Sequence, residues 1–231
     1  MNQIISQLRT QAKFRIPKQL VRLYWVQVQK KVSPFDYNHQ LHRAIFIHIP
    51  KTGGTSVTTA LFNKKSGHYR SEEFEIFDSQ KFNDYFKFAF VRNPWDRFLS
   101  AYLYLKKGGD NSFDKAWSDS NLSEFDSFAE FTHALTDKKR AANILSWMHF
   151  TPQYLYVCDL RSNIVMDFIG RFENINEDYE RIRNRLGIGS ELPHLRKTKN
   201  NKYQDYYTED SRRIVANLYR KDIEIFNYTF E

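Results

Sequence analysis

The chain has 231 residues, of which 41% are hydrophobic and 16% aromatic, so it is long enough to form one domain with a sizeable aromatic core. Its single cysteine, Cys158, excludes an intrachain disulfide and indicates a reducing compartment, so we predict a cytoplasmic protein with an inert, buried thiol. Removing the seven basic residues of positions 1–35 from the net charge of +8 leaves about +1 for the other 196 residues. A nearly neutral body argues against a nucleic-acid partner and suits a small anionic ligand better.

Residues 1–35 contain no acidic residue, and we predict that they form a basic N-terminal arm beside a single domain over residues 36–231. Apolar residues of the arm fall on one helical face: Leu20, Val21, Tyr24, Trp25 and Val28. The stretch is too short and too interrupted to span a bilayer. Two interpretations stay open, namely a helix packed on the domain and a peripheral contact of residues 1–30 with the inner face of an anionic membrane.

The next segment combines a buried strand, a glycine turn and a helix start. Residues 43–49 are mostly apolar, as in a strand that is buried on both faces, and Pro50 ends the run. A helix is expected over residues 55–64, with Thr55 or Ser56 as its cap. The turn between them contains Lys51, Thr52, Gly53 and Gly54. Because glycines let backbone N–H groups approach an anion and a helix N-terminus is partly positive, this segment predicts an anion-binding site with Lys51 as its mobile charge.

A second strand is predicted over residues 85–91, and Arg92 follows directly at its carboxyl end. Asn93 caps the helix that follows, and Gly108-Gly109 ends it. Open parallel sheets bind ligands at the carboxyl ends of their strands, where a guanidinium can hold a phosphate with two parallel hydrogen bonds. Ser100 follows about two helical turns later. The alternative interpretation is that Arg92 makes a structural ion pair and that Ser100 is an ordinary helix residue that binds no ligand.

The rest of the chain alternates helices, loops and one more strand. We expect helices over 123–135 and 138–148, a strand over 165–172, a helix from a cap at Asn174 with Glu177 to Gly187, and a last helix from Thr208. Residues 65–80 and 110–122 are predicted to be loops, and 188–207 an irregular basic segment. Strands separated by helices predict an α/β fold with a parallel sheet covered on both sides.

Together the two motifs resemble a known family. The stretches are Ile49-Pro-Lys-Thr-Gly-Gly-Thr-Ser56 and Phe88-Ala-Phe-Val-Arg-Asn-Pro-Trp-Asp-Arg-Phe-Leu-Ser-Ala-Tyr102. They are similar to the 5′-phosphosulfate loop and the 3′-phosphate element of sulfotransferases that use 3′-phosphoadenosine 5′-phosphosulfate (PAPS), in the carbohydrate branch of Golgi-type and bacterial enzymes. The resemblance is firm over residues 43–105 and weaker over 148–153, 169–174 and the segment from Pro193 onward.

This resemblance implies a P-loop-like three-layer sandwich with a central parallel sheet flanked by helices. It also implies PAPS as the sulfuryl donor, a hydroxyl of an oligosaccharide or polysaccharide as the acceptor, and no metal ion. Lys51 would act in catalysis and, with Thr52, Gly53, Gly54, Thr55, Ser56, Arg92 and Ser100, would hold the donor. Arg171 and Lys197 would approach the nucleotide. The alternative for Arg171 is an ion pair with Glu173 or another acid, and the alternative for Lys197 is a place in a solvated loop.

The resemblance also favours His149 as the general base, since the unperturbed pKa of histidine lies near neutrality. His48 is expected to be a core residue, and His68 carries no motif. Tyr69, Phe113 and Trp117 lie in the two predicted loops and either stack on sugar rings or pack locally. Two rivals remain, a P-loop-type nucleotide or sugar kinase and a non-catalytic nucleotide-binding module. The first lacks the G-x-x-x-x-G-K-[ST] motif, and Lys51 argues against the second.

Overall fold

A computed structural model describes residues 18–28, 32–192 and 202–231 of the chain. Its centre is a sheet of three parallel strands in the order β1 (Ala44–Ile47), β2 (Phe86–Val91) and β3 (Phe168–Arg171). Phe46 of β1 lies beside Phe88 of β2, which lies beside Phe168 of β3. Helices connect each strand to the next, as parallel pairing requires. The predicted α/β class and parallel sheet are confirmed.

The helices of the described residues are α2 (Lys18–Leu23), α3 (Tyr37–His42), α4 (Gly54–Phe62), α5 (Ser71–Phe77), α6 (Ser79–Asp84), α7 (Pro94–Lys106), α8 (Ser112–Asn121), α9 (Phe128–Ala134), α10 (Lys138–Ser146), α11 (Tyr154–Val157), α12 (Ile175–Leu186), α13 (Glu209–Leu218) and α14 (Arg220–Phe226). Shorter turns are η1 (Tyr24–Val28), η2 (Phe172–Asn174) and η3 (Tyr203–Tyr206). Asn93 caps α7 through its side chain, as predicted, and Thr208, at the expected start of the last helix, caps α13. Asn174 is the N-cap residue of α12, as predicted, but its side chain makes no capping hydrogen bond, so the predicted capping box with Glu177 is absent.

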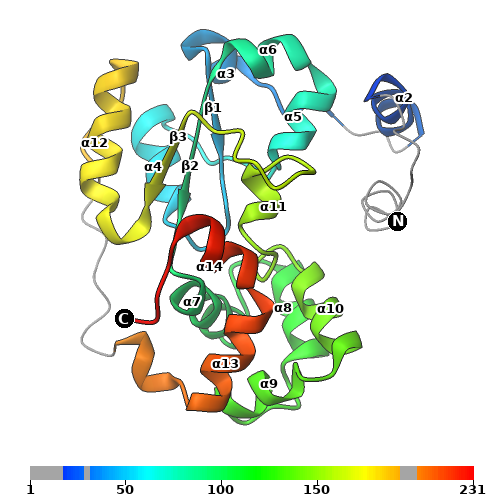
Figure 1. Cartoon of the computed structure of the whole chain (residues 1–231). Helices are drawn as coiled ribbons and strands as arrows, with labels where there is room; N and C mark the ends of the chain where they lie inside the picture. Colours follow the sequence, from blue (N-terminus) through cyan, green and yellow to red (C-terminus); the bar gives the residue numbers. More distant parts are fainter. Residues whose placement is uncertain (1–17, 29–31, 193–201) are drawn as a thin grey trace.

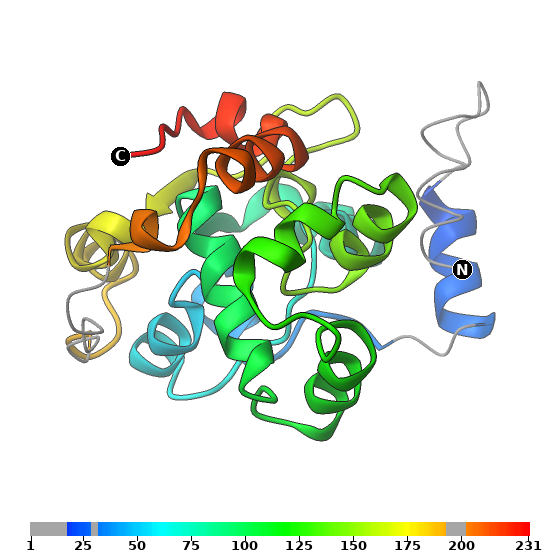
Figure 2. The same cartoon turned by 90° about the horizontal axis from the view of Figure 1, so that it is seen from below.

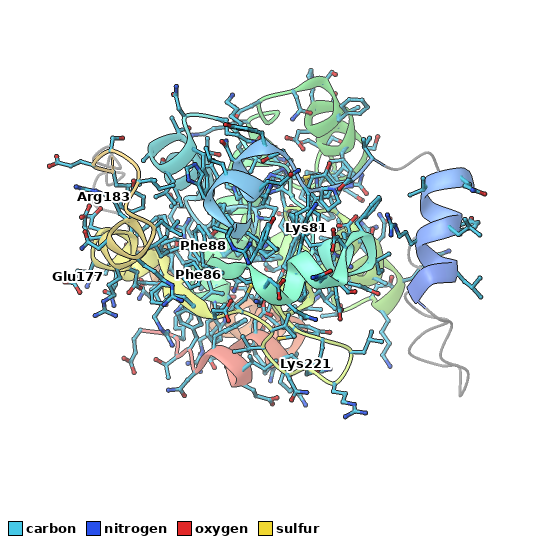
Figure 3. The ribbon with its side chains drawn as sticks, turned by 90° about the horizontal axis from the view of Figure 1, so that it is seen from above. Lys81, Phe86, Phe88, Glu177, Arg183 and Lys221 are labelled. Atoms are coloured by element: carbon cyan, nitrogen blue, oxygen red, sulfur yellow. The ribbon has the colours of Figure 1, made fainter. Side chains whose placement is uncertain are left out.

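Because successive side chains of a strand point to opposite faces of the sheet, each face packs against its own layer of helices. Ile45, Ile47 and Val91 face a cluster that includes Phe74 of α5 and Phe226 of α14. The opposite face packs on α4 and α12, through Phe46, Phe88, Phe90, Val57, Leu61, Tyr179 and Ile182. Figure 1 shows these layers, and Figure 3 shows Phe86 and Phe88 on the side of the sheet where α12 lies.

A second core lies beyond the carboxyl ends of the strands, where α7 packs among α8, α9, α10 and α13 (Figures 1 and 2). Aromatic rings fill it: the Phe98 ring lies 5.7 Å from Phe131, 5.2 Å from Phe150 and 5.8 Å from Tyr219, measured between ring centroids. Burial of such large side chains is the main favourable contribution to a core of this kind. This core fixes α7, and with it the face of α7 that meets the loop after β1.

Both predicted loops contain helices, which corrects the sequence analysis. Within residues 65–80, α5 forms because Phe74, Ile76 and Phe77 are buried. Within residues 110–122, α8 forms although its buried residues are the polar Asp114 and Ser118. A polar buried face gives no apolar periodicity, so the sequence pattern could not indicate it. The strand predicted over 165–172 is shorter than expected, and the last helix is divided at Tyr219 into α13 and α14.

The arm is helical where it is described, through α2 and η1. The α2 helix lies near α5. Tyr24 packs on Ile76 and Phe77. Leu20, Leu23 and Val26 are nevertheless 56%, 50% and 42% exposed. Contact with the domain and an exposed apolar stripe therefore coexist. None of the helices in the described part of the chain has the length and the apolar character that crossing a membrane requires.

Candidate active site

The loop after β1 has the strand–turn–helix form that the sequence predicts. Lys51 has a φ of +70°, in the left-handed region that non-glycine residues rarely adopt, which marks it as a functional candidate. Thr52 is fully buried, and its hydroxyl donates to the Ile49 carbonyl at 2.9 Å. The buried Arg97 of α7 donates from Nε to the Pro50 carbonyl at 2.9 Å. The loop is therefore held from two sides. In the first turn of α4, the N–H groups of Ser56 and Val57 donate to the Gly53 carbonyl at 3.1 and 3.3 Å, which leaves those of Gly54 and Thr55 for an anion.

The helix α4 begins at Gly54, earlier than predicted, and the glycines set its approach. Its cap is Gly53, with a φ of +78° and no side-chain bond, so the expectation that Thr55 or Ser56 caps it is wrong. A Cβ on Gly54 would lie 2.1 Å from Cδ2 of His48, so that position must be glycine. His48 is a buried core residue as predicted, because its ring stacks on Phe46 and its Nδ1 lies 2.9 Å from the Ser66 hydroxyl.

Arg92 joins the two motifs. Its Nη1 donates to the Lys51 carbonyl at 3.1 Å, and its guanidinium lies 4.2 Å from the centre of the Phe172 ring. Its Nε and Nη2 donate to the carboxylate of Asp96 at 2.8 and 2.7 Å. The structural ion pair that the sequence left as an alternative is thus present. Three of the five N–H donors of the guanidinium are used in these bonds, which leaves two for a ligand.

The backbone at the end of β2 is anchored by distant parts of the chain. Gln153 accepts from the Arg92 N–H at 2.9 Å and donates to the Arg92 carbonyl at 2.8 Å. The fully buried Asp222 of α14 accepts in turn from the backbone N–H of Gln153 at 2.8 Å. The Asn93 side chain donates to the Thr229 carbonyl at 2.8 Å. We call Asp222 and Thr229 the C-terminal anchors, since they hold the second motif from the end of the chain.

The other predicted donor residues lie at different distances from this centre. Ser100 is half-buried on α7, on the same helical face as Asp96 and Tyr104, to which it is related by four-residue steps. Arg171 turns to the C-terminal segment, where Nη2 donates to the Phe226 carbonyl at 2.6 Å and the guanidinium lies over the Tyr228 ring. Its proposed contact with the nucleotide stays a prediction. Lys197 lies outside the described residues.

The ammonium group of Lys51 rests on an aromatic ring. Its Nζ lies 3.9 Å from the centre of the Tyr104 ring, a cation–π contact. Burial lowers the pKa of Lys51 to about 8, and the positive charges of Arg92 and Arg97 act in the same direction, whereas Asp110 and Asp114 raise it. Lys51 is therefore mostly protonated at neutral pH, but a small rise in pH discharges it.

The predicted base, His149, is held by a buried carboxylate. Its Nε2 lies 3.1 Å from Oδ1 of Asp114, whose Oδ2 accepts from the Tyr104 hydroxyl at 2.8 Å. Burial lowers the pKa of His149 to about 4 against the opposing charge of Asp114, so the imidazole is neutral at pH 7, as a general base must be. Its Nδ1 is buried and has no hydrogen-bond partner among the described residues.

His68 joins this site without any signal in the sequence. Its ring centroid lies 4.2 Å from that of His48 and 6.5 Å from that of His149. Its Nδ1 lies 2.9 Å from the His48 carbonyl, which can only accept, so Nδ1 carries the proton and Nε2 has the free lone pair. Burial lowers the pKa of His68 as well. Sequence reasoning also missed Tyr104 and Asp114, since the partners of each lie in other segments.

Two further predictions concern the metal and the thiol. Across the residues that the structure describes, no group of three or more His, Cys, Asp or Glu side chains is arranged to hold a metal ion, and a metal-free site stays a prediction. Cys158 is buried, and burial raises the pKa of its thiol to about 11. The predicted burial of the thiol is confirmed, and its inertness, which the raised pKa favours, stays a prediction.

Comparison with known proteins agrees with this geometry. The sequence model described as the sulfotransferase family matches residues 35–229. An uncharacterised protein of Archaeoglobus fulgidus is 32% identical over 113 residues, which cover 48% of this chain and 75% of that protein. Carbohydrate sulfotransferase 10 of Xenopus laevis is 22% identical, over 81% of this chain and 65% of the relative. Carbohydrate sulfotransferase 9 of Homo sapiens is 22% identical, over 84% of this chain and 53% of the relative.

The chain thus spans about half to two thirds of these two carbohydrate sulfotransferases. No solved structure matches it. The family match covers both motifs, the two helical layers and the C-terminal anchors. The chain therefore belongs to the sulfotransferase family.

Proposed function

We propose that this sulfotransferase moves a sulfuryl group from PAPS to a hydroxyl of a carbohydrate. The observation that carries the proposal is the contact between the two motifs, in which the Arg92 guanidinium binds the Lys51 carbonyl at 3.1 Å. It places a glycine-containing helix start and a half-buried arginine at the carboxyl ends of the adjacent strands β1 and β2. The donor PAPS carries one phosphate on the 5′ position and one on the 3′ position of its ribose, so it needs two such anion sites side by side. The P-loop-like character of the fold belongs to this proposal.

Each part of the loop then has a role in positioning and charge stabilisation, as in phosphoryl transfer. The N–H groups from Thr52 to Thr55 and the Ser56 hydroxyl hold the 5′-phosphate, since the Ser56 N–H donates to the Gly53 carbonyl. Lys51 neutralises the charge that grows on the leaving phosphate oxygen. Arg92 uses its two remaining N–H donors, with the Ser100 hydroxyl, on the 3′-phosphate. Because ATP has no 3′-phosphate, these two residues favour PAPS over ATP.

The base that receives the acceptor proton is proposed to be His149. Asp114 holds its Nε2, so the free lone pair is on Nδ1, a buried atom that an acceptor hydroxyl would supply with a partner. His68 is the second candidate, because the free lone pair of its Nε2 belongs to a half-buried side chain. Both imidazoles are neutral at pH 7, since burial lowers their pKa.

A carbohydrate acceptor is proposed from the two carbohydrate sulfotransferases that the chain resembles and from the rim of the site. Phe113 is 80% exposed and precedes Asp114, and Tyr69 is exposed and follows His68. Exposed rings beside catalytic groups are suited to stacking on the apolar faces of sugars. Trp117 stacks instead on Trp147, with ring centroids 5.1 Å apart, so we assign it to local packing.

The proposal is tested by calorimetric binding of adenosine 3′,5′-bisphosphate, adenosine 5′-phosphosulfate and ATP. Arg92→Ala should weaken bisphosphate binding by roughly 1.5–3 kcal/mol, the range for a charge-assisted hydrogen bond, and hardly change phosphosulfate binding. Arg213→Ala is the matched control, because Arg213 also pairs with a carboxylate of its own helix but is exposed. Equal losses for both ligands would make Arg92 structural, and preferred binding of ATP would favour the kinase. Bisphosphate binding without sulfuryl transfer would favour the non-catalytic module.

We further propose that residues 1–30 bring the enzyme to the inner face of an anionic membrane in the cytoplasm. The support is the exposed apolar stripe of Leu20, Leu23 and Val26 beside the exposed Arg22, in a segment that carries no acidic residue. The Tyr24 contact with α5 is compatible with this role, because it leaves the stripe uncovered.

A further inference from the structure

Asp114 is a buried carboxylate whose oxygens are both occupied by other segments of the site. It is 3% exposed. Its Oδ2 accepts from the Tyr104 hydroxyl of α7 at 2.8 Å and from the Asn111 amide at 2.8 Å, and its Oδ1 lies 3.1 Å from Nε2 of His149. A charged group is buried at this cost only where several donors compensate it, so the arrangement defines one geometry.

One of these bonds fixes the ring that carries Lys51. The Tyr104 hydroxyl donates to Asp114 and accepts from the Asp110 N–H at 2.9 Å, so the phenol is held at its oxygen from two directions. The face of the same ring lies 3.9 Å from Nζ of Lys51. A shift of the Tyr104 ring would therefore change the cation–π contact that positions the Lys51 ammonium group.

The bond to His149 fixes a tautomer. A carboxylate only accepts hydrogen bonds, so Nε2 carries the proton and the lone pair is left on Nδ1. The His149 ring also lies 5.0 Å from the Tyr104 ring, measured between centroids. The two groups that act on donor and acceptor thus share one support.

We propose that Asp114 is a positioning residue that aligns Lys51, through Tyr104, and sets the proton-accepting nitrogen of His149. This inference rests on the roles proposed above for Lys51 and His149. The charged groups that face Lys51 are Arg92, Arg97, Asp110 and Asp114. The charged and titratable groups that face His149 are Lys51, His48, His68 and Asp114. Asp114 is common to both sets, and its negative charge raises the pKa of each group, so its loss should lower both.

The test compares three variants of the full chain. Asp114→Asn keeps the shape but removes the charge, and with its amide oxygen kept on Tyr104 and Asn111 it turns its amide nitrogen, which can only donate, toward Nε2 of His149. Tyr104→Phe keeps the ring and the bond to His149 but removes the link to Asp114. Asp119→Asn is the control, because Asp119 lies on the same helix, is exposed and pairs with Lys115. Lys51 is titrated by the pH dependence of its acylation, read by mass spectrometry of its peptide, and the His149 tautomer is read from its imidazole ¹⁵N shifts.

We expect Asp114→Asn to lower the pKa of Lys51 below about 8 and to change the His149 tautomer. Tyr104→Phe should alter the Lys51 titration alone, and Asp119→Asn neither readout. Turnover of Asp114→Asn should fall by roughly 10- to 100-fold, as when the support of an active group is lost. Unchanged readouts in a folded Asp114→Asn protein would overturn the inference. If that variant does not fold, an unchanged Lys51 titration in Tyr104→Phe overturns it. Neither the Lys51 titration nor the His149 tautomer measurement needs a substrate. A parent protein that transfers no sulfuryl group would therefore refute the proposed function separately.

Discussion

The burial of Lys51 should appear directly in the pH dependence of catalysis. Burial lowers its pKa from the usual 10.5 to about 8. Lys51 stabilises negative charge only while it is protonated, so activity must fall as the pH rises through this value. The kcat/KM for the donor reports the free enzyme, and it should be half its plateau near pH 8 and about tenfold below it at pH 9. A lysine with the usual pKa would keep the full rate over this range.

The assay follows release of adenosine 3′,5′-bisphosphate at constant ionic strength from pH 6 to 9.5. Lys51→Arg should remove the basic limb, because a guanidinium keeps its proton at these pH values. Lys51→Ala should lower turnover by at least ~10²-fold, as the loss of one preorganised charge stabiliser does, and weaken bisphosphate binding less. Lys115→Ala is the control, since Lys115 is an exposed lysine paired with Asp119.

The Tyr104 hydroxyl, next to Lys51, does not titrate in this window. The pKa of the Tyr104 hydroxyl is raised to about 12 by burial and by its bond to Asp114, so a limb near pH 8 is not due to that phenol. A parent profile that stays flat through pH 9, or a basic limb that persists in Lys51→Arg, would refute the assignment of the limb to Lys51. Turnover of Lys51→Ala within threefold of the parent would remove Lys51 from the mechanism.

Three further outcomes are expected. His149→Ala should cut turnover by roughly 10²-fold or more, with donor affinity unchanged, and should remove the acidic limb, which a profile extended to lower pH should show near pH 4. Loss of that limb in His68→Ala instead would make His68 the base. Deleting residues 1–30 should abolish sedimentation with vesicles that contain anionic lipid and leave bisphosphate binding intact, whereas loss of folding would favour a purely structural arm. Gly54→Ala should destabilise the fold by about 1–3 kcal/mol in thermal unfolding, although alanine favours helices, because its Cβ meets His48. Adding His48→Ala should recover part of that loss, and no recovery would contradict the steric explanation.

The two local units that are proposed to hold the donor could be predicted because their signals are local. Lys51 and Gly53 lie within one strand–turn–helix unit, and Arg92 and Asn93 within another, so each unit is readable by itself. The error at the start of α4 has a physical reason. The left-handed backbone of Gly53 begins the helix without a side-chain cap, whereas sequence rules look for a Ser or Thr.

The acceptor side could not be predicted, because its contacts exist only in the folded chain. Asp114 meets His149 across 35 residues of sequence, and His68 meets the His48 carbonyl across 20. The segment around Asp114 resembles a loop because the residues that α8 buries are polar. The ion pair of Arg92 with Asp96 follows a four-residue helical spacing and was open to prediction, but the choice between ion pair and ligand binding was not.

The C-terminal anchors have a consequence for how the protein folds while the ribosome makes it. Asn93 and Thr229 are separated by 136 residues, so the ribosome finishes the second motif long before it makes the residues that hold it. At translation rates of about 5–20 residues per second, that interval lasts on the order of ten seconds. During this time the strand end at Arg92 has neither Asp222, through Gln153, nor Thr229 behind it. A nascent chain or one cut short before Thr229 should therefore hold this strand end poorly, and the proposed donor binding becomes a property that the protein acquires only after the segment from Asp222 to Thr229 has been made.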